Sequence, residues 1–123
     1  MRKKILIIED EEILLSLIEK KLINNDYDVY AATDGEEGFE AMNKNKPDLV
    51  LLDIIMPVLD GFEVMEKMNK TNDLNLDKLP VIIISNSGQP VEIKRAIKMG
   101  VKDYLIKTSF DPSEVLEKVK KYI

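Results

Sequence analysis

The sequence predicts an α/β fold in which strands and helices alternate from one end of the chain to the other. Five short apolar runs rich in β-branched residues are each followed by a segment with helical periodicity. The chain has 123 residues, 45% hydrophobic and 33% charged, which suits a single domain over residues 1–123. Strands that alternate with helices favour a parallel five-stranded sheet covered by helices on both faces.

The composition of each expected strand indicates its place in the sheet. Three runs are almost wholly apolar, as is typical of central parallel strands. The second run is more mixed and suits an edge. The expected strands are Lys4–Ile8, Asp28–Ala32, Asp48–Leu52, Pro80–Ser85 and Asp103–Lys107.

The expected helices are marked by apolar residues three and four positions apart, which we assign to the core. These residues are Leu14, Leu17, Ile18 and Leu22; Phe39, Ala41 and Met42; Phe62, Met65 and Met68; Ile93, Ala96 and Ile97; and Val115, Leu116, Val119 and Ile123. Asp34, Asp60 and Asp111 each precede a helical segment and have Glu three residues later, the pattern of an N-cap. Gly100 is suited to follow the fourth helix, and the polar segment 70–79 is expected to be a surface loop.

The composition excludes several functions. The chain has neither cysteine nor histidine, which removes disulfides, thiolate and imidazole metal ligands, and catalysis by a serine–histidine pair. A net charge of −5 argues against direct binding to nucleic acid. No signal-peptide pattern is present, and no apolar run approaches the roughly 20 residues that span a bilayer. We therefore expect a cytoplasmic protein with no membrane partner.

Ionic and hydroxyl side chains follow four of the five expected strands. Glu9 and Asp10 follow the first, Asp53 the third, Ser85 ends the fourth and Lys107 the fifth. The carboxyl ends of parallel strands form the edge where such sheets bind ligands. Crowded carboxylates repel one another unless a cation intervenes, and ligation by oxygen alone selects Mg²⁺ or Mn²⁺. A carboxylate can also attack phosphorus, while an amine and a hydroxyl bind phosphate oxygens.

Each of these residues also has a purely structural explanation. Glu9 and Asp10 could simply favour the N-terminus of the first helix. Asp53 could be a turn residue, and Lys107 a solvated charge. The joint placement of complementary groups at four strand ends favours a phosphoryl site over four separate explanations.

The same residues lie in motifs that resemble the receiver domain of bacterial two-component response regulators. The most specific is the stretch 47–61, in which Asp53 follows an apolar strand and is followed by Met56-Pro57 and Asp60-Gly61. Weaker motifs occur in the right order at 5–11, 80–85 and 100–107, and the resemblance runs from residue 5 to 123. It implies a flavodoxin-like three-layer (βα)5 sandwich with strand order 2-1-3-4-5, as in a chemotaxis receiver.

The resemblance also implies a role for each site residue. Asp53 would accept a phosphoryl group from the phosphohistidine of a sensor histidine kinase or a histidine phosphotransfer protein. Asp10 resembles the direct Mg²⁺ ligand and Glu9 the acid that acts through a bound water, while the backbone carbonyl of Ile55 would complete the metal shell. Such a chain is no enzyme in the conventional sense, although it promotes its own aspartyl phosphorylation and dephosphorylation.

Two further residues resemble the family's switch. Ser85 corresponds to a hydroxyl drawn to the phosphate, and Tyr104 to an aromatic side chain that changes rotamer with it. An aromatic residue in a strand can also simply pack. The output partner is not indicated, and both a stand-alone regulator and an excised domain remain open.

Three departures from the family pattern affect the surroundings of the site. Thr108 stands where the family commonly has a proline with a cis bond, and such a bond to another residue costs about 3 kcal/mol. Asn86 is larger than the usual residue after the switch hydroxyl, and could narrow access to the phosphate or hydrogen-bond it. Ile55 and Ser87 occupy positions that tune hydrolysis in the family. Because an apolar Ile55 cannot orient water, we expect a persistent phosphoryl group.

Alternative functions differ in how well they fit. A phosphatase of the haloacid dehalogenase type needs a second Asp two residues after the nucleophile, where this chain has Ile55. A flavodoxin needs a phosphate loop rich in Ser, Thr or Gly after the first strand, where this chain has acids from Glu9 to Glu12. A degenerate receiver, acting only as a phosphorylation-independent interaction module, stays open because of Thr108 and Asn86.

Overall fold

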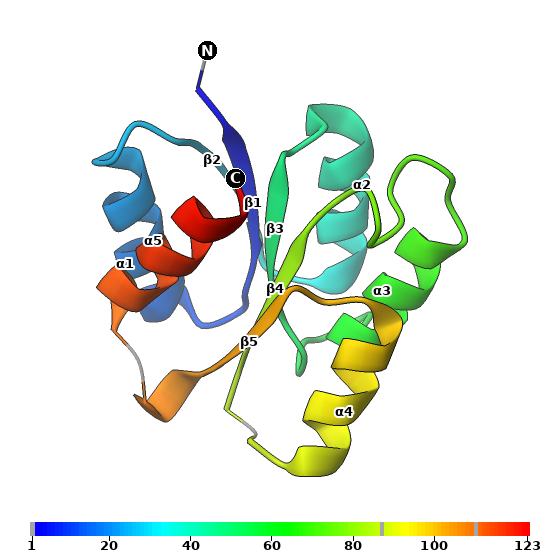
Figure 1. The fold of residues 1–123 in the computed structure, drawn as a ribbon. Helices are drawn as coiled ribbons and strands as arrows, with labels where there is room; N and C mark the ends of the chain where they lie inside the picture. The colour runs from blue at the N-terminus through cyan, green and yellow to red at the C-terminus, as the bar shows by residue number, and fades with distance from the viewer. Residues whose placement is uncertain (1, 87, 110) are drawn as a thin grey trace.

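The computed structural model describes residues 2–86, 88–109 and 111–123, and contains one sheet between two layers of helices (Figure 1). Its elements in chain order are β1 (Lys4–Ile8), α1 (Glu12–Ile23), β2 (Asp28–Ala32), α2 (Gly35–Asn45), β3 (Leu49–Asp53), α3 (Gly61–Asn69), β4 (Val81–Ser85), α4 (Pro90–Met99), β5 (Asp103–Ile106), the 3₁₀ turn η1 (Lys107–Ser109) and α5 (Pro112–Tyr122). The predicted (βα)5 order is confirmed.

All neighbouring strands are parallel, in the order β2-β1-β3-β4-β5, which confirms the predicted topology. The register aligns Ile8 of β1 with Leu52 of β3, and Asp53 of β3 with Ile84 of β4. Carboxyl ends from different parts of the chain therefore reach the same edge. Several strand boundaries differ by one residue from expectation. Strand β3 runs from Leu49 to Asp53 and β4 begins at Val81, whereas β5 ends at Ile106, so that Lys107 begins the turn η1.

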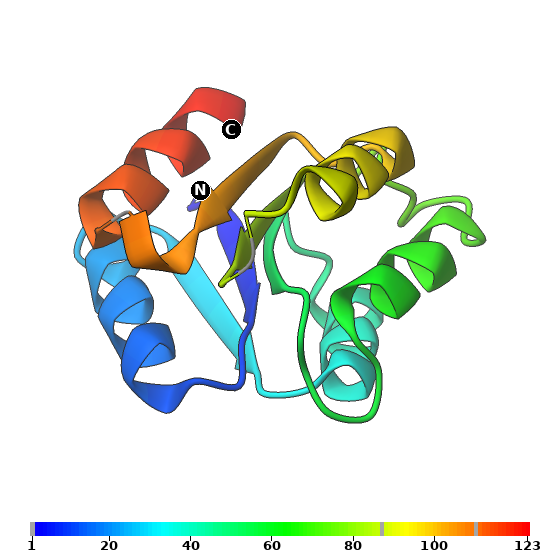
Figure 2. The ribbon, with the colours of Figure 1, turned by 90° about the horizontal axis from the view of Figure 1, so that it is seen from below.

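The central strands separate two hydrophobic cores. Alternate residues such as Leu6 and Val50 face α2, α3 and α4, whereas Ile5 and Leu49 face α1 and α5. Figure 2 shows α1 and α5 on one side of the sheet and the other three helices on the opposite side. All of these strand residues are fully buried, as expected for central parallel strands.

Two residues assigned to the core from sequence are exposed instead. Leu17 is 49% exposed and Ile97 60% exposed. In α1 the buried stripe is formed by Leu15, Ile18 and Leu22, so Leu17 lies beside it on the solvent side. A run of consecutive leucines allows two overlapping stripes, and only the packing against α5 decides between them.

The three predicted N-caps are confirmed. Asp34 accepts a hydrogen bond from the Glu37 backbone N–H at 2.8 Å, and Asp111 caps α5 in the same way. Asp60 and Glu63 form a reciprocal capping box at the start of α3. These caps satisfy amide groups that helix geometry leaves free, which fixes where each helix begins.

The segment 70–79 is polar but is more than a surface loop. Leu74, Leu76 and Leu79 are all at most 5% exposed and extend the core beneath α3 and α4. Asn69 fastens the segment, because its side chain donates to Met99 O at 3.1 Å and accepts from Leu76 N–H at 3.0 Å. These leucines follow no regular period and lie among polar residues, so their burial was not predicted from the sequence.

Helix α4 has fewer buried residues than any other α-helix of the fold. Of its ten residues only Ala96 is buried. Arg95 connects it to α3, because its guanidinium lies 4.0 Å from the centre of the Phe62 ring and 3.7 Å from Glu66 Oε1. None of the helices in the described ranges has the length and hydropathy needed to cross a membrane.

Candidate functional site

The structure brings the predicted polar residues together at the carboxyl edge of the sheet. Glu9, Asp53 and Ser85 are buried at the ends of β1, β3 and β4, although they are ionic or polar. Lys107 enters from the turn after β5, and its side chain is only 6% exposed. Buried charges are rare unless they are paired. We therefore expect the charged side chains of this site to form ion pairs with one another.

The amine of Lys107 is the centre of the site. Its Nζ lies 2.9 Å from Glu9 Oε1, 3.1 Å from Asp53 Oδ2 and 3.3 Å from Glu11 Oε1. Glu9 also accepts a hydrogen bond from the Glu11 backbone N–H at 3.0 Å, which holds its carboxylate in place. One cation is therefore in contact with two buried carboxylates and one half-exposed carboxylate.

Three carboxylates form a group able to hold a metal ion. Ligand oxygens of Glu9, Asp10 and Asp53 all lie within 4.8 Å of one another. Asp10 is exposed, so the group opens toward solvent. Donor sets made of carboxylate oxygens suit Mg²⁺ or Mn²⁺. The three negative charges exceed the single positive charge of Lys107, and the residues present therefore fit a divalent cation.

Electrostatics in the site disfavour a charged Asp53. Burial raises the pKa of Asp53 to about 7, the negative charge of Glu9 acts in the same direction, and Lys107 opposes both. Burial alone would lower the pKa of Lys107, but its hydrogen bond to Glu9 and the charges of Asp53 and Glu9 raise it. The amine thus stays charged, whereas Asp53 lies close to its own midpoint at neutral pH.

The Tyr104 side chain lies beside Ser85. Burial and the charges of Glu92 and Asp53 raise the pKa of Tyr104, and a hydrogen bond with the Ser85 side chain opposes this rise. The two residues expected to act as a switch are therefore in contact. The structure also places Tyr104 against the core cluster that α3 and α4 share.

The loop between β3 and α3 is tightly closed. The Gly61 backbone N–H donates to Ile54 O at 2.7 Å, and Leu59 N–H donates to Pro57 O at 2.9 Å around Val58, which has a φ of 70°. A positive φ is uncommon for a β-branched residue, and this three-residue turn is a strained form. Ile55 lies in this loop with 67% of its surface exposed.

Gly61→Ala is expected to lower the free energy of unfolding by about 2–3 kcal/mol. An added Cβ would lie 2.5 Å from Asp53 O and 2.8 Å from Ile54 Cα, which are backbone atoms at the end of β3 and the start of the loop that follows it. Urea denaturation measures the loss. Gly88→Ala is the control, because its Cβ would meet only the movable side chain of Ile106, at 2.6 Å from Cδ1. Equal losses in the two variants would contradict this account of the loop.

The structure describes some of the residues that depart from the family pattern. Lys107 and Thr108 form a 3₁₀ turn, and no cis peptide bond occurs in the described part of the chain. Asn86 is exposed, and its Nδ2 donates to Glu11 Oε1 at 3.4 Å. Ser87 lies outside the described residues.

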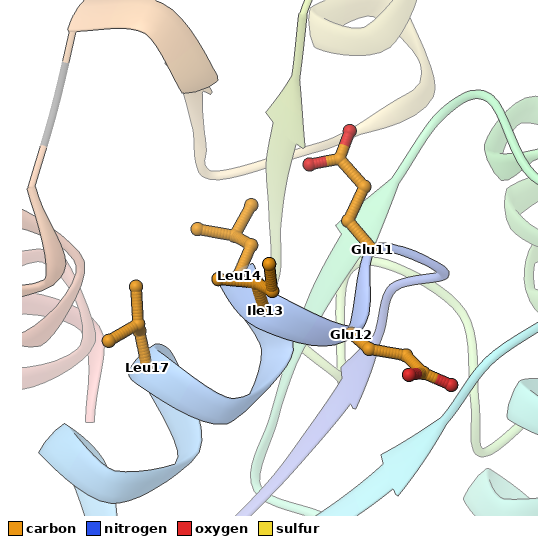
Figure 3. A pocket seen from close by; sticks show the side chains of 5 residues that line it. All are labelled: Glu11, Glu12, Ile13, Leu14 and Leu17. Carbon is orange, nitrogen blue, oxygen red and sulfur yellow. The ribbon is translucent and has the colours of Figure 1, made fainter.

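Sequence reasoning did not single out Glu11 as a site residue. It follows two acids in a motif, and only the fold shows that its side chain reaches Lys107. Glu11 also lines a hollow of about 580 Å³, together with Glu12, Ile13, Leu14 and Leu17. Figure 3 shows these five side chains. Neither Asp53 nor Lys107 lines this hollow, so it adjoins the acid cluster and does not contain it.

Together these features define a flavodoxin-like α/β domain with paired acids, a hydroxyl and an amine at the edge where such sheets bind phosphate groups. Residues 5–120 match the model of the response regulator receiver domain, and the chain belongs to this family. Its role is that of a two-component receiver, which is regulatory and differs from that of a conventional enzyme.

Known proteins agree with this assignment. The alkaline phosphatase synthesis transcriptional regulatory protein PhoP of Bacillus subtilis is 34% identical over 120 residues, which are 98% of this chain and 48% of that protein. The probable transcriptional regulator ycf29 of Porphyra purpurea is 36% identical, over 100% of this chain and 57% of that protein. A CheY-like response regulator receiver domain protein from Methanospirillum hungatei superposes with a TM-score of 0.88 at 26% identity, over 98% of this chain and 93% of that chain. The chain spans about half the length of these curated relatives.

Proposed function

We propose that Asp53 accepts a phosphoryl group from the phosphohistidine of a sensor histidine kinase or a histidine phosphotransfer protein. The observation that carries this proposal is the 3.1 Å contact between Asp53 Oδ2 and Lys107 Nζ inside a group of three carboxylates. A purely structural ion pair has no need of two further acids beside it. A cytoplasmic location follows from such a partner and is part of the same proposal.

In the proposed reaction a carboxylate oxygen of Asp53 forms a bond to phosphorus. The bond from phosphorus to the donor's imidazole nitrogen breaks, and that nitrogen keeps the electron pair. Lys107, held 3.1 Å from the acceptor oxygen, neutralises charge on the transferred group. Mg²⁺, held by Asp10, Asp53 and the Ile55 carbonyl and by Glu9 through water, would neutralise the remaining charge when bound.

The proposed output is a change of surface around α4 and β5. Once phosphate occupies the site, its oxygens compete for the Ser85 hydroxyl, which hydrogen-bonds Tyr104 in this structure. Tyr104 would then change its contacts beside α4, the helix with the least buried surface. The curated relatives are named as transcriptional regulators, so an output acting on transcription through another part of the protein or a partner is a proposal for this chain as well.

Acetyl phosphate with Mg²⁺ tests the proposal, with intact-protein mass spectrometry as the readout. The chain is expected to gain the mass of one phosphoryl group. Asp53→Asn is expected to gain none, because the amide is a poor nucleophile. Asp77→Asn serves as the control, since it removes an exposed aspartate in the loop before β4 and should leave the gain intact. Failure of the unmodified chain to react with acetyl phosphate or a beryllofluoride mimic would favour the alternative, an interaction module independent of phosphorylation.

A further inference from the structure

Glu11 is an exposed carboxylate tied to the buried amine of the site. Its side chain is 50% exposed, yet Oε1 lies 3.3 Å from Lys107 Nζ. By position it is the N-cap of α1, but it makes no capping hydrogen bond with its side chain. The side chain is thus directed at Lys107 and not at the amides that an acid in this position usually satisfies.

A second contact holds Glu11 from the opposite side of the site. Asn86, in the segment after β4, donates from Nδ2 to the same Oε1 atom at 3.4 Å. This bond is long and exposed, so it is weak. Together, Glu11 and Asn86 connect the segment after β1 with the segment after β4 beside the buried Lys107–Asp53 pair.

The three carboxylates on Lys107 differ in how easily they can leave it. Glu9 and Asp53 are 2% and 4% exposed, and their contacts with Nζ are 2.9 and 3.1 Å. Glu11 has the longest of the three contacts and can be hydrated at once when it leaves. A phosphoryl oxygen that approaches Lys107 will therefore displace Glu11 before the other two.

We propose that Glu11 is a specificity-determining residue that selects against small dianionic phosphodonors. Glu11 takes up a hydrogen-bonding position on the Lys107 amine that the phosphoryl oxygen of the donor needs. In addition, the exposed negative charge of Glu11 repels an approaching dianion. Asn86 adds a smaller contribution, because its weak hydrogen bond favours the same position of Glu11. This inference rests on the proposed phosphorylation of Asp53.

The test compares initial rates of phosphorylation with acetyl phosphate and with phosphoramidate, a donor of lower net negative charge, in saturating Mg²⁺. Glu11→Gln is expected to raise the rate with acetyl phosphate about 3- to 10-fold, and to raise the rate with phosphoramidate less. The ratio of the two rates is a readout that a general loss of stability would not shift in this direction. Asn86→Ala is expected to give a smaller rise of the same kind.

Two further variants serve as controls. Glu12→Gln removes an equal, exposed charge one residue away, whose side chain points in a different direction from that of Glu11 (Figure 3), and should change both rates less than about twofold. Glu11→Asp keeps the charge and should stay near the unmodified chain. An unchanged or lower acetyl phosphate rate in Glu11→Gln, with normal phosphorylation of the unmodified chain, would overturn this inference alone. No phosphorylation of the unmodified chain by either donor would overturn the proposed function and this inference with it.

Discussion

Asp53→Asn is expected to raise the free energy of unfolding of the metal-free protein by about 1–3 kcal/mol at pH 8. The carboxylate is 4% exposed and lies among other acids, and its pKa rises to about 7 through burial and the charge of Glu9. An amide of the same shape carries no charge to bury. The variant that removes the proposed phosphoacceptor should therefore be the more stable protein.

The size of this effect depends on pH. Between the ordinary pKa of 3.8 and about 7, the folded protein keeps the Asp53 proton while the unfolded chain has lost it. The Asp53 contribution to stability therefore falls as the pH rises through this range. Asp53→Asn and the unmodified chain should differ little near pH 4 and most above pH 7.

Urea denaturation in EDTA at pH 5 and pH 8 measures the difference. Asp77→Asn is the matched control, and its stability should follow that of the unmodified chain at both values. Added Mg²⁺ should stabilise the unmodified chain more than Asp53→Asn, because one of the three grouped carboxylates is missing from the variant. A variant less stable than the unmodified chain at pH 8 would show that the Lys107 contact outweighs the burial of Asp53.

Lys107→Met is expected to have the opposite effect, lowering the free energy of unfolding at pH 8 by about 3 kcal/mol. The substitution leaves Glu9 and Asp53 buried without the amine that lies 2.9 and 3.1 Å from them. Lys107 lowers the pKa of Asp53, so its loss raises that pKa further. The penalty should then grow as the pH rises, and added Mg²⁺ should recover part of it.

The control for this variant is Lys118→Met. Lys118 also forms an ion pair, 3.0 Å from Asp103, but its side chain is 34% exposed, so the loss should be below about 1 kcal/mol. The double variant Lys107→Met with Asp53→Asn should lose less than Lys107→Met alone, because one uncompensated charge is gone. If Lys107→Met and Lys118→Met had equal effects, the buried amine would not stabilise the acids as described.

The strands and the edge of the sheet could be predicted because their signals are local. A continuous β-branched run identifies a buried parallel strand, and a polar residue at its end must lie at the carboxyl edge, as Asp53 does. The exposure of Leu17 could not be predicted in this way. The neighbouring leucines are compatible with two different buried faces of the helix, and only the packing in the folded protein decides which face is buried. The buried leucines of the segment 70–79 follow no period that sequence patterns could reveal.

Most members of the candidate site were predictable, but Glu11 and the contacts between the members were not. Placing Glu9, Asp53 and Lys107 at strand ends requires only the topology. The contact between Glu11 and Lys107 depends on how the first residues after β1 turn into α1, which no pattern of residue types encodes. An exposed acid beside two other acids has an ordinary explanation in the helix dipole, so a contact between Glu11 and Lys107 could not be preferred on the pattern alone.

Helix α4 has one buried residue among ten, and this uneven burial has a consequence for how the fold opens. Amide protons of the fully buried central strands should exchange with solvent only when the whole domain unfolds. Those of α4 can exchange through a smaller event, in which the helix detaches while the sheet and the α1–α5 layer stay intact. Helix α4, which lies next to Tyr104, is thus the helix whose separation from the sheet requires the least free energy.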